Sequence, residues 1–144
     1  MLTADQICQY APPSNHLEEK IILVSGAGGG IGRAVALACA EHGATTILVG
    51  RSIDNLERTY DAILDRNTNI PAICPIDLEI AGPEEYAKIN LLIESQFGRL
   101  DGLVNNAAIL GSRTPMNHYK PRTWESVLKI NLTAQYMLTQ ALIP

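Results

Sequence analysis

The sequence predicts an α/β fold, in which helices cover a parallel β-sheet. Four short apolar segments alternate along the chain with segments whose apolar residues recur at helical spacing, and this alternation is typical of the fold class. The first apolar segment, residues 21–24, runs directly into a glycine-rich turn, and a helical segment follows it. Strands joined through helices in this way are parallel, and their crossovers are right-handed.

The third predicted strand identifies one edge of the sheet. Strands are predicted at residues 20–25, 45–49, 70–76 and 102–105. The second is rich in β-branched residues, whereas the third contains Pro71 and Pro75, which cannot donate hydrogen bonds to a neighbouring strand. A strand of this kind belongs at an edge, which the third strand occupies in a doubly wound sheet of order 3-2-1-4. We therefore predict a Rossmann-type doubly wound parallel sheet with this order.

Helices are predicted at residues 31–42, from residue 52, at residues 83–97 and from residue 121. Gly43 suits the position after the first helix, Ser52 is a good N-cap for the second, and Pro83 suits the first turn of the third. The residues that recur at helical spacing are Ile31, Val35 and Ala38; Ile53, Leu56, Tyr60, Ile63 and Leu64; Tyr86, Ile89, Ile93 and Phe97; and Trp124, Val127, Leu128, Asn131, Gln135 and Leu138.

The length and composition fit a single domain. The chain has 144 residues, enough for one hydrophobic core. Residues 1–19 are polar and contain Pro12 and Pro13, so we predict an irregular N-terminal arm with a short helical turn near residues 4–10. Residues 20–144 are predicted to form the domain.

Charge and hydropathy exclude several classes of partner. The net charge of −4 argues against a nucleic-acid surface and against a polybasic membrane anchor. The apolar runs are too short to span a bilayer, and the first 20 residues do not form a secretory signal. Three scattered cysteines, Cys8, Cys39 and Cys74, predict free thiols and no zinc site. We therefore expect a cytoplasmic protein with no nucleic-acid, membrane or metal partner.

The glycine-rich turn is the strongest functional signal. Its glycines do not fit G-x-G-x-x-G, but Gly26, Gly30 and Gly32 fit G-x-x-x-G-x-G. Glycine permits a positive φ and leaves no Cβ between the backbone and a ligand. The helix that follows presents free N–H groups and the positive end of its dipole, which suit a pyrophosphate. The alternative is a tight strand-to-helix turn that binds no ligand.

Four motifs in this order resemble the short-chain dehydrogenase/reductase family. Residues 25–32, Ser-Gly-Ala-Gly-Gly-Gly-Ile-Gly, are similar to its T-G-x-x-x-G-I-G turn, with serine in place of threonine. Asp77 and Leu78 resemble its adenine-contacting segment, and residues 105–108 resemble its N-N-A-G segment, with Ala108 in place of glycine. Residues 129–132 resemble the helical segment that carries its catalytic Asn. The resemblance extends from Leu17 to nearly the end of the chain.

The resemblance implies a set of site residues, and each also has a structural interpretation. It implies that Asn131 holds a water in a proton relay, although an internally satisfied amide is the alternative. Asp77 could instead cap a turn, and Asn105 and Asn106 could satisfy backbone groups, which in the family is the role of the first Asn. The implied cofactor-binding residues are Ser25, Gly26, Gly28, Gly30, Ile31, Gly32, Asp77, Leu78, Asn106, Ala107 and Ala108.

Arg51 predicts the choice of cofactor. Enzymes that use NAD commonly place an acidic residue at the end of the second strand, but Gly50 and Arg51 stand there in this chain. A guanidinium can grip a 2′-phosphate through two hydrogen bonds, and Ser52 could add a hydroxyl. Some NADP-binding relatives carry a second basic residue where this chain has Gly29. We predict that NADP(H) is preferred and that NAD(H) is possible; the alternative is a solvated surface arginine.

The family's catalytic Ser and Tyr-x-x-x-Lys pair are not found. None of the five tyrosines is followed by Lys four residues later. The resemblance implies hydride exchange between the nicotinamide and a small carbonyl or alcohol substrate. We expect that the chain is a fragment truncated before the catalytic segment, inactive alone, and able to form homo-oligomers. The alternatives are a non-catalytic nucleotide-binding module and an oligomerising interaction protein.

Overall fold

The computed structural model, which describes residues 11–66 and 69–143, contains one four-stranded parallel sheet. Its strands are β1 (Ile21–Ser25), β2 (Thr45–Gly50), β3 (Ala72–Pro75) and β4 (Gly102–Val104), in the order β3-β2-β1-β4. The predicted fold class and strand order are confirmed, with β3 at one edge and β4 at the other. The predicted helical turn near residues 4–10 lies outside the described residues.

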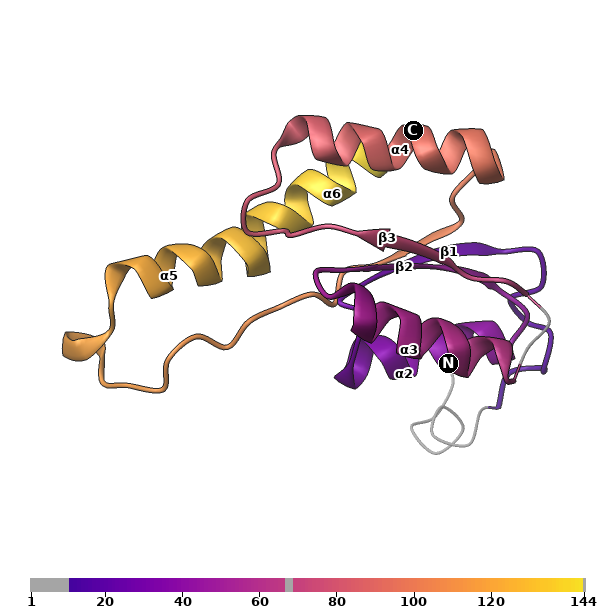
Figure 1. The fold of residues 1–144 in the computed structure, drawn as a ribbon, viewed down its shortest axis with the longest axis horizontal. Coiled ribbons are helices and arrows are strands. Elements are labelled where there is room, and N and C mark those ends of the chain that lie inside the picture. Colours follow the sequence, from indigo (N-terminus) through magenta and orange to yellow (C-terminus); the bar gives the residue numbers. More distant parts are fainter. Residues whose placement is uncertain (1–10, 67–68, 144) are drawn as a thin grey trace, which may run out of the picture.

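Helices form a layer on each face of the sheet (Figure 1). Helices α2 (Gly30–Glu41) and α3 (Ile53–Leu64) cover one face, and α4 (Pro83–Phe97) and α6 (Ala134–Leu142) cover the other. Between β4 and α6 the chain passes through a short 3-10 helix (Met116–His118), α5 (Pro121–Leu128) and a π-helical turn (Lys129–Thr133). No helix in the described part of the chain is both long and apolar enough to cross a membrane.

Alternating strand residues supply two hydrophobic cores. Along β1, Ile22 and Val24 face α2 and α3, whereas Leu23 faces α4 and α6. Strand β2 pairs in parallel with β1, with Ile47 beside Leu23 and Leu48 beside Val24, so its side chains alternate in the same way. Burial of each of these aliphatic side chains contributes about 1.5–3 kcal/mol. The central strands are therefore buried on both faces, as expected for a parallel sheet.

The predicted apolar face of the first helix is wrong at two of its three residues, and only Val35 packs against the core. Ile31 is 76% exposed and Ala38 is also exposed. The buried residues of α2 are Gly32, Ala36 and Ala40. These small residues allow the helix backbone to approach the sheet closely, whereas the sequence pattern was interpreted from the larger side chains. In α3 the predicted Leu56 and Ile63 are buried together with Thr59, whereas Ile53 and Leu64 at the two ends of the helix are exposed.

The last helix departs from the single regular helix that was predicted. The π-helical turn separates α5 from α6, and α5 extends beyond the sheet at the left of Figure 1. Leu138 of α6 is fully buried, but Trp124 of α5 is 50% exposed. Trp124 packs edge-on against Tyr119, with their ring centroids 6.4 Å apart. The apolar residues of α5 therefore lie outside both cores.

Asp101 joins the beginnings of β1 and β4. Its carboxylate accepts a hydrogen bond of 2.9 Å from the backbone amide of Ile21 and lies 3.3 Å from Lys20 Nζ and 3.1 Å from Arg99 Nε. The Ile21 amide, and secondarily the two cations, lower the pKa of this carboxyl group below its usual value. The backbone amide of Asp101 in turn donates to the Ile21 carbonyl at 2.9 Å, so the register of the two strands is fixed at this end.

Two buried threonines provide a matched test of the core. Thr46 is 1% exposed, and its hydroxyl has no hydrogen-bond partner among the described residues. Thr59 is 0% exposed, and its hydroxyl donates to the Ala27 carbonyl at 2.9 Å. We expect Thr59→Val to lower the free energy of unfolding by about 1–2 kcal/mol, and Thr46→Val to leave it unchanged or raise it by up to about 1 kcal/mol. Urea unfolding measures both, and equal losses would contradict the assignment of the Thr46 hydroxyl as unpaired.

Candidate functional site

The glycine turn connects β1 to α2 through a close backbone contact. Gly26 has a φ of +69°, a conformation that residues with a Cβ rarely adopt. A Cβ on Gly32, in the first turn of α2, would overlap the carbonyl oxygen of Gly26. The amide of Ala27 donates to the Val49 carbonyl of β2 at 3.1 Å. The turn is therefore packed against the sheet and against the beginning of its own helix.

Ser25 and Asn106 hold the glycine turn to the segment after β4. The Ser25 hydroxyl donates to the Val104 carbonyl at 3.2 Å and accepts from the amides of Asn106 and Ala107, each at 3.0 Å. The Asn106 side chain donates back to the Ser25 carbonyl at 2.9 Å. The second asparagine of the motif therefore performs the structural role that the resemblance gave to the first. Asn105 instead donates to the Thr139 hydroxyl of α6 at 2.9 Å.

A cleft of about 170 Å³ lies at the carboxyl ends of the four strands. Gly26 follows β1, Arg51 follows β2, Asp77 follows β3 and Ala107 follows β4. The carboxyl ends of parallel strands are where open α/β sheets bind ligands, at the point where the strand order reverses. In this sheet the reversal lies between β1 and β4. The cleft is lined by Gly26, Gly50, Arg51, Ile76, Asp77, Leu78, Ala107, Ala108, Ile109 and Ile130.

Six of the predicted site residues meet in this cleft, and the others lie around it. Gly28 packs against α3, because a Cβ there would lie 3.0 Å from the Cβ of Asn55. Gly30 and Ile31 begin α2, and a Cβ added at Gly30 would meet no protein atom within 4 Å. The residues outside the cleft lining are Ser25, Gly28, Gly30, Ile31, Gly32, Ser52, Asn106 and Asn131.

Arg51 is exposed at the rim of this cleft. No carboxylate pairs with its guanidinium, and no hydrogen bond engages it, in the described part of the chain. Ser52 follows it and caps α3 as predicted, since its hydroxyl accepts from the Asn55 amide at 3.4 Å. The Ser52 hydroxyl is therefore already engaged by the helix, whereas the Arg51 donors are free for an anion.

Asp77 caps a turn and also faces the cleft. Its Oδ1 accepts from the Glu79 amide at 3.0 Å, and its backbone carbonyl accepts from the Ala81 amide at 3.0 Å. No donor among the described residues reaches Oδ2. The structural interpretation of Asp77 is thus correct for one carboxylate oxygen, and the other remains available to a donor in the cleft.

Two amide side chains from the last helical region form hydrogen bonds with the backbone of the segment after β4. Asn131 of the π-helical turn exchanges two hydrogen bonds of 2.9 Å with the backbone amide and carbonyl of Ile109. Gln135 of α6 donates to the Ala107 carbonyl at 2.7 Å, and its Oε1 is buried without a partner in the described residues. Asn131 is exposed, so its amide faces the backbone of this segment and not the interior. Gln135 carried no sequence signal except helical spacing.

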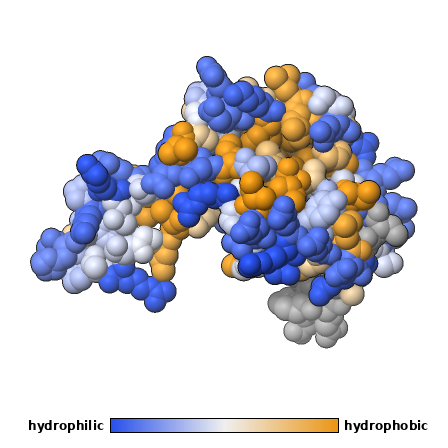
Figure 2. Space-filling view, viewed as in Figure 1, coloured by the Kyte–Doolittle hydropathy of each residue, from blue (hydrophilic) through white to orange (hydrophobic). Residues whose placement is uncertain are grey.

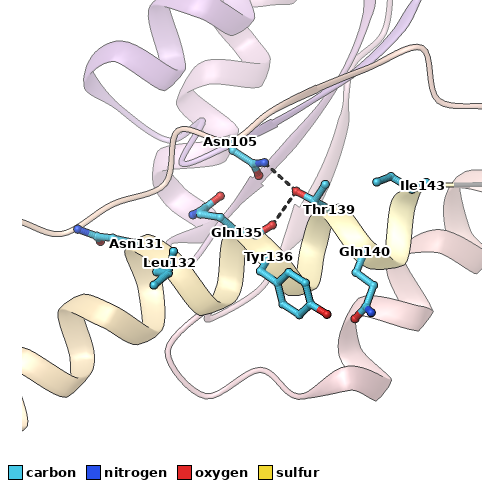
Figure 3. Close-up of a pocket in the computed structure, with 8 residues that line it drawn as sticks. All are labelled: Asn105, Asn131, Leu132, Gln135, Tyr136, Thr139, Gln140 and Ile143. Atoms are coloured by element: carbon cyan, nitrogen blue, oxygen red, sulfur yellow. Dashed lines mark hydrogen bonds between the residues drawn. The ribbon is translucent and has the colours of Figure 1, made fainter.

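A larger, mostly apolar cavity of about 480 Å³ lies on the other side of these amides (Figure 3). The Asn105 to Thr139 hydrogen bond crosses its upper side in the figure. Tyr136 is the one ionisable residue that lines it, and it has no lysine beside it in the lining. Its lining residues are Asn105, Asn131, Leu132, Gln135, Tyr136, Thr139, Gln140 and Ile143. Within residues 11–66 and 69–143, no cluster of His, Cys, Asp and Glu could hold a metal ion.

Comparison with known proteins gives consistent matches. The chain matches the short chain dehydrogenase family over residues 20–144. It is 38% identical over 135 residues to "Uncharacterized oxidoreductase YciK" of Escherichia coli K12, a region that covers 94% of this chain and 54% of that protein. A short chain dehydrogenase structure from Salmonella enterica serovar Typhi superimposes with a TM-score of 0.91 and 41% identity, covering 94% of this chain and 56% of the other.

A third match was solved with a cofactor. This structure from Escherichia coli CFT073, described as a short chain dehydrogenase complexed with NADPH, superimposes with a TM-score of 0.88 and 37% identity. The match covers 91% of this chain and 55% of the other. The chain thus spans about half the length of the relatives that it matches.

Substitution by alanine should affect stability differently at two glycines of the turn. We expect Gly32→Ala to lower the free energy of unfolding by roughly 2 kcal/mol or more, because the Cβ would overlap the Gly26 carbonyl. Gly29 has an extended backbone, and a Cβ there would meet no atom within 4 Å, so Gly29→Ala should change stability by less than about 0.5 kcal/mol. Urea unfolding of both variants decides this, and a fully stable Gly32→Ala would refute the close contact.

Proposed function

The chain belongs to the short-chain dehydrogenase family, and from this membership we propose that it binds NADP(H) at the glycine turn and the adjoining cleft. In this proposal residues 20–144 are the cofactor-binding part of an oxidoreductase. The observation that carries the proposal is the convergence of Gly26, Arg51, Asp77 and Ala107 on one cleft at the carboxyl edge of the sheet. The NADPH complex of a 37% identical protein supports it.

The beginning of α2 suits a pyrophosphate. No side chain caps this helix, and no acidic residue lies in its first turn. Its first backbone N–H groups therefore lack partners within the helix. A Cβ at Gly29 or Gly30 would meet nothing within 4 Å, so the space beside these two residues is open. A diphosphate would satisfy the donors and interact favourably with the helix dipole.

Arg51 and Asp77 would select the adenosine end of the cofactor. The free guanidinium of Arg51 would bind the 2′-phosphate through charge-assisted hydrogen bonds, which favours NADP(H) over NAD(H). Asp77 Oδ2 would accept from the adenine, and Leu78 would contribute an apolar contact beside it. The hydroxyl of Ser52 remains an N-cap in this arrangement and adds at most a second interaction.

The nicotinamide end would lie along the segment after β4. Ala107 and Ala108 would form the floor of the site, and Ser25 and Asn106 hold that floor in place from behind. When bound, the cofactor supplies the hydride acceptor or donor for a small carbonyl or alcohol substrate. Asn131 would act by holding the Ile109 backbone and a water beside it.

Catalytic turnover requires groups that these 144 residues lack. None of the tyrosines has a lysine four residues later, so no residue pair could transfer the proton as in the family. We therefore propose that these 144 residues bind the cofactor but do not catalyse hydride transfer without further polypeptide. The second candidate function is a non-catalytic nucleotide-binding module, which the same observation favours.

Association with another polypeptide is also proposed. Among the described residues, strand β4 pairs with β1 alone and contains no proline or charged residue, and such an edge invites pairing. Trp124 of α5 is half exposed beyond the sheet. Figure 2 shows further hydrophobic residues at the surface over α4, where Leu91 is 63% exposed. A homo-oligomer would cover part of this apolar surface.

Arg51→Asp tests the choice of cofactor. We expect it to weaken NADPH binding by roughly 1.5–3 kcal/mol, because one charge-assisted contact is lost, and to leave NADH binding nearly unchanged. Fluorescence titration with each cofactor measures the two dissociation constants. Arg66→Asp is the control, because Arg66 pairs with Glu41 at 3.1 Å, away from the cleft. Equal losses for both cofactors would contradict the proposed role of Arg51.

The purified 144-residue chain tests the remaining proposals. We expect it to bind NADPH, to show no NADPH oxidation with any carbonyl substrate, and to scatter light as an oligomer. The first result follows from the cleft, the second from the missing Tyr–Lys pair, and the third from the open β4 edge. Turnover above background would refute the second expectation, and a stable monomer would refute the third.

A further inference from the structure

We propose that Thr59 of α3 is a positioning residue that orients the glycine turn for the diphosphate of the cofactor, an inference that rests on the proposed function. Thr59 is 0% exposed and is not among the residues that line the cleft. Its hydroxyl donates to the carbonyl of Ala27, which lies 32 residues earlier and inside the turn, at 2.9 Å. Nothing in the sequence pattern distinguishes Thr59 from the other residues of its helix.

The hydroxyl of Thr59 has a local alternative, which makes the contact with the turn informative. A threonine in a helix commonly bonds the carbonyl four residues earlier, and that acceptor, Asn55 O, lies 3.2 Å away. The hydroxyl has one proton to donate, and two carbonyl oxygens lie within reach. The Ala27 oxygen is the nearer of the two. The helix therefore directs this buried donor toward the glycine turn in addition to its own backbone.

The Ala27 peptide groups are held on both sides. The amide of Ala27 donates to Val49 of β2 at 3.1 Å, and its carbonyl accepts from Thr59 of α3. Ala27 itself is fully buried. The next residue, Gly28, also packs closely, because its lack of a Cβ lets the turn lie against the Asn55 side chain of α3. Two elements that follow the turn in sequence thus fix its conformation.

This restraint sets the direction of a free donor. In a trans peptide the carbonyl and the following N–H point in opposite directions. Because the Ala27 carbonyl points toward Thr59 of α3, the Gly28 N–H points away from α3, to the opposite side of the turn. No acceptor among the described residues takes this N–H, and Gly28 is only half-buried. Thr59 therefore holds one backbone donor aimed away from the core, beside the uncapped beginning of α2, where an anion would bind.

The test compares two ligands and three variants. NADPH contains the diphosphate, whereas adenosine 2′-monophosphate contains only the end that Arg51 and Asp77 would bind. We expect Thr59→Val to raise the dissociation constant of NADPH about tenfold, as loss of one well-oriented hydrogen bond would. The same variant should change the dissociation constant of adenosine 2′-monophosphate less than about twofold. Thr59→Ser, which keeps the hydroxyl, should bind NADPH within about twofold of the parent protein.

Thr46→Val is the matched control, because it removes an equally buried hydroxyl with no partner among the described residues. It should leave both dissociation constants unchanged. Unchanged NADPH affinity in Thr59→Val would overturn the positioning role. Equal weakening of both ligands would also overturn it, since a general loss of folded protein would act in this way. Failure of the parent protein to bind NADPH would instead overturn the proposed function, and the role of Thr59 with it.

Discussion

The hydroxyl of Ser25 is the interaction on which the candidate site depends. It is fully buried and takes part in three hydrogen bonds, one with Val104 at the end of β4 and two with the segment that follows. Asn106 completes the junction through the Ser25 carbonyl. Because buried polar groups are costly without partners, the end of β1 and the exit of β4 can adopt only conformations that preserve this set. The glycine turn and the floor of the cleft are consequently one rigid unit.

Small residues place the rest of the site around that unit. Gly32 brings α2 against the Gly26 carbonyl, and Ala36 and Ala40 continue the close contact with the sheet. The helices that follow β2 and β3 are capped, α3 by Ser52 and α4 by the Glu85 carboxylate, which accepts from the Gly82 amide at 2.9 Å. Helix α2 has no such cap. Its free donors are compatible with the fold only where water or an anion reaches them.

The fold class and strand order could be predicted because they depend on local pattern: apolar segments, turn glycines and the prolines of β3. Six of the residues that the motifs singled out line one cleft in the structure, and their binding of a cofactor stays a prediction. The buried face of α4 was predicted correctly through Tyr86, Ile89 and Ile93. The buried face of α2 could not be predicted, because hydropathy emphasises large residues and α2 is buried through small ones. The roles of Thr59 and Gln135 could not be predicted either, since each acts on a carbonyl 28 to 32 residues away. The hydroxyl of Ser25 makes three hydrogen bonds within the protein, and a contact of Ser25 with the cofactor stays a prediction.

The two edges of the sheet differ in chemistry, and this difference bears on which edge could pair with another strand. Beside β3, Pro71 and Pro75 remove backbone donors, which discourages pairing with another strand. Strand β4 has the sequence Gly-Leu-Val, and its free edge retains its backbone groups. The cavity in Figure 3 lies along the same side, lined by Leu132, Tyr136 and Ile143 of the last helical segment. Among the described residues, β4 therefore keeps an edge whose backbone groups could pair with another strand, whereas the prolines protect the β3 edge.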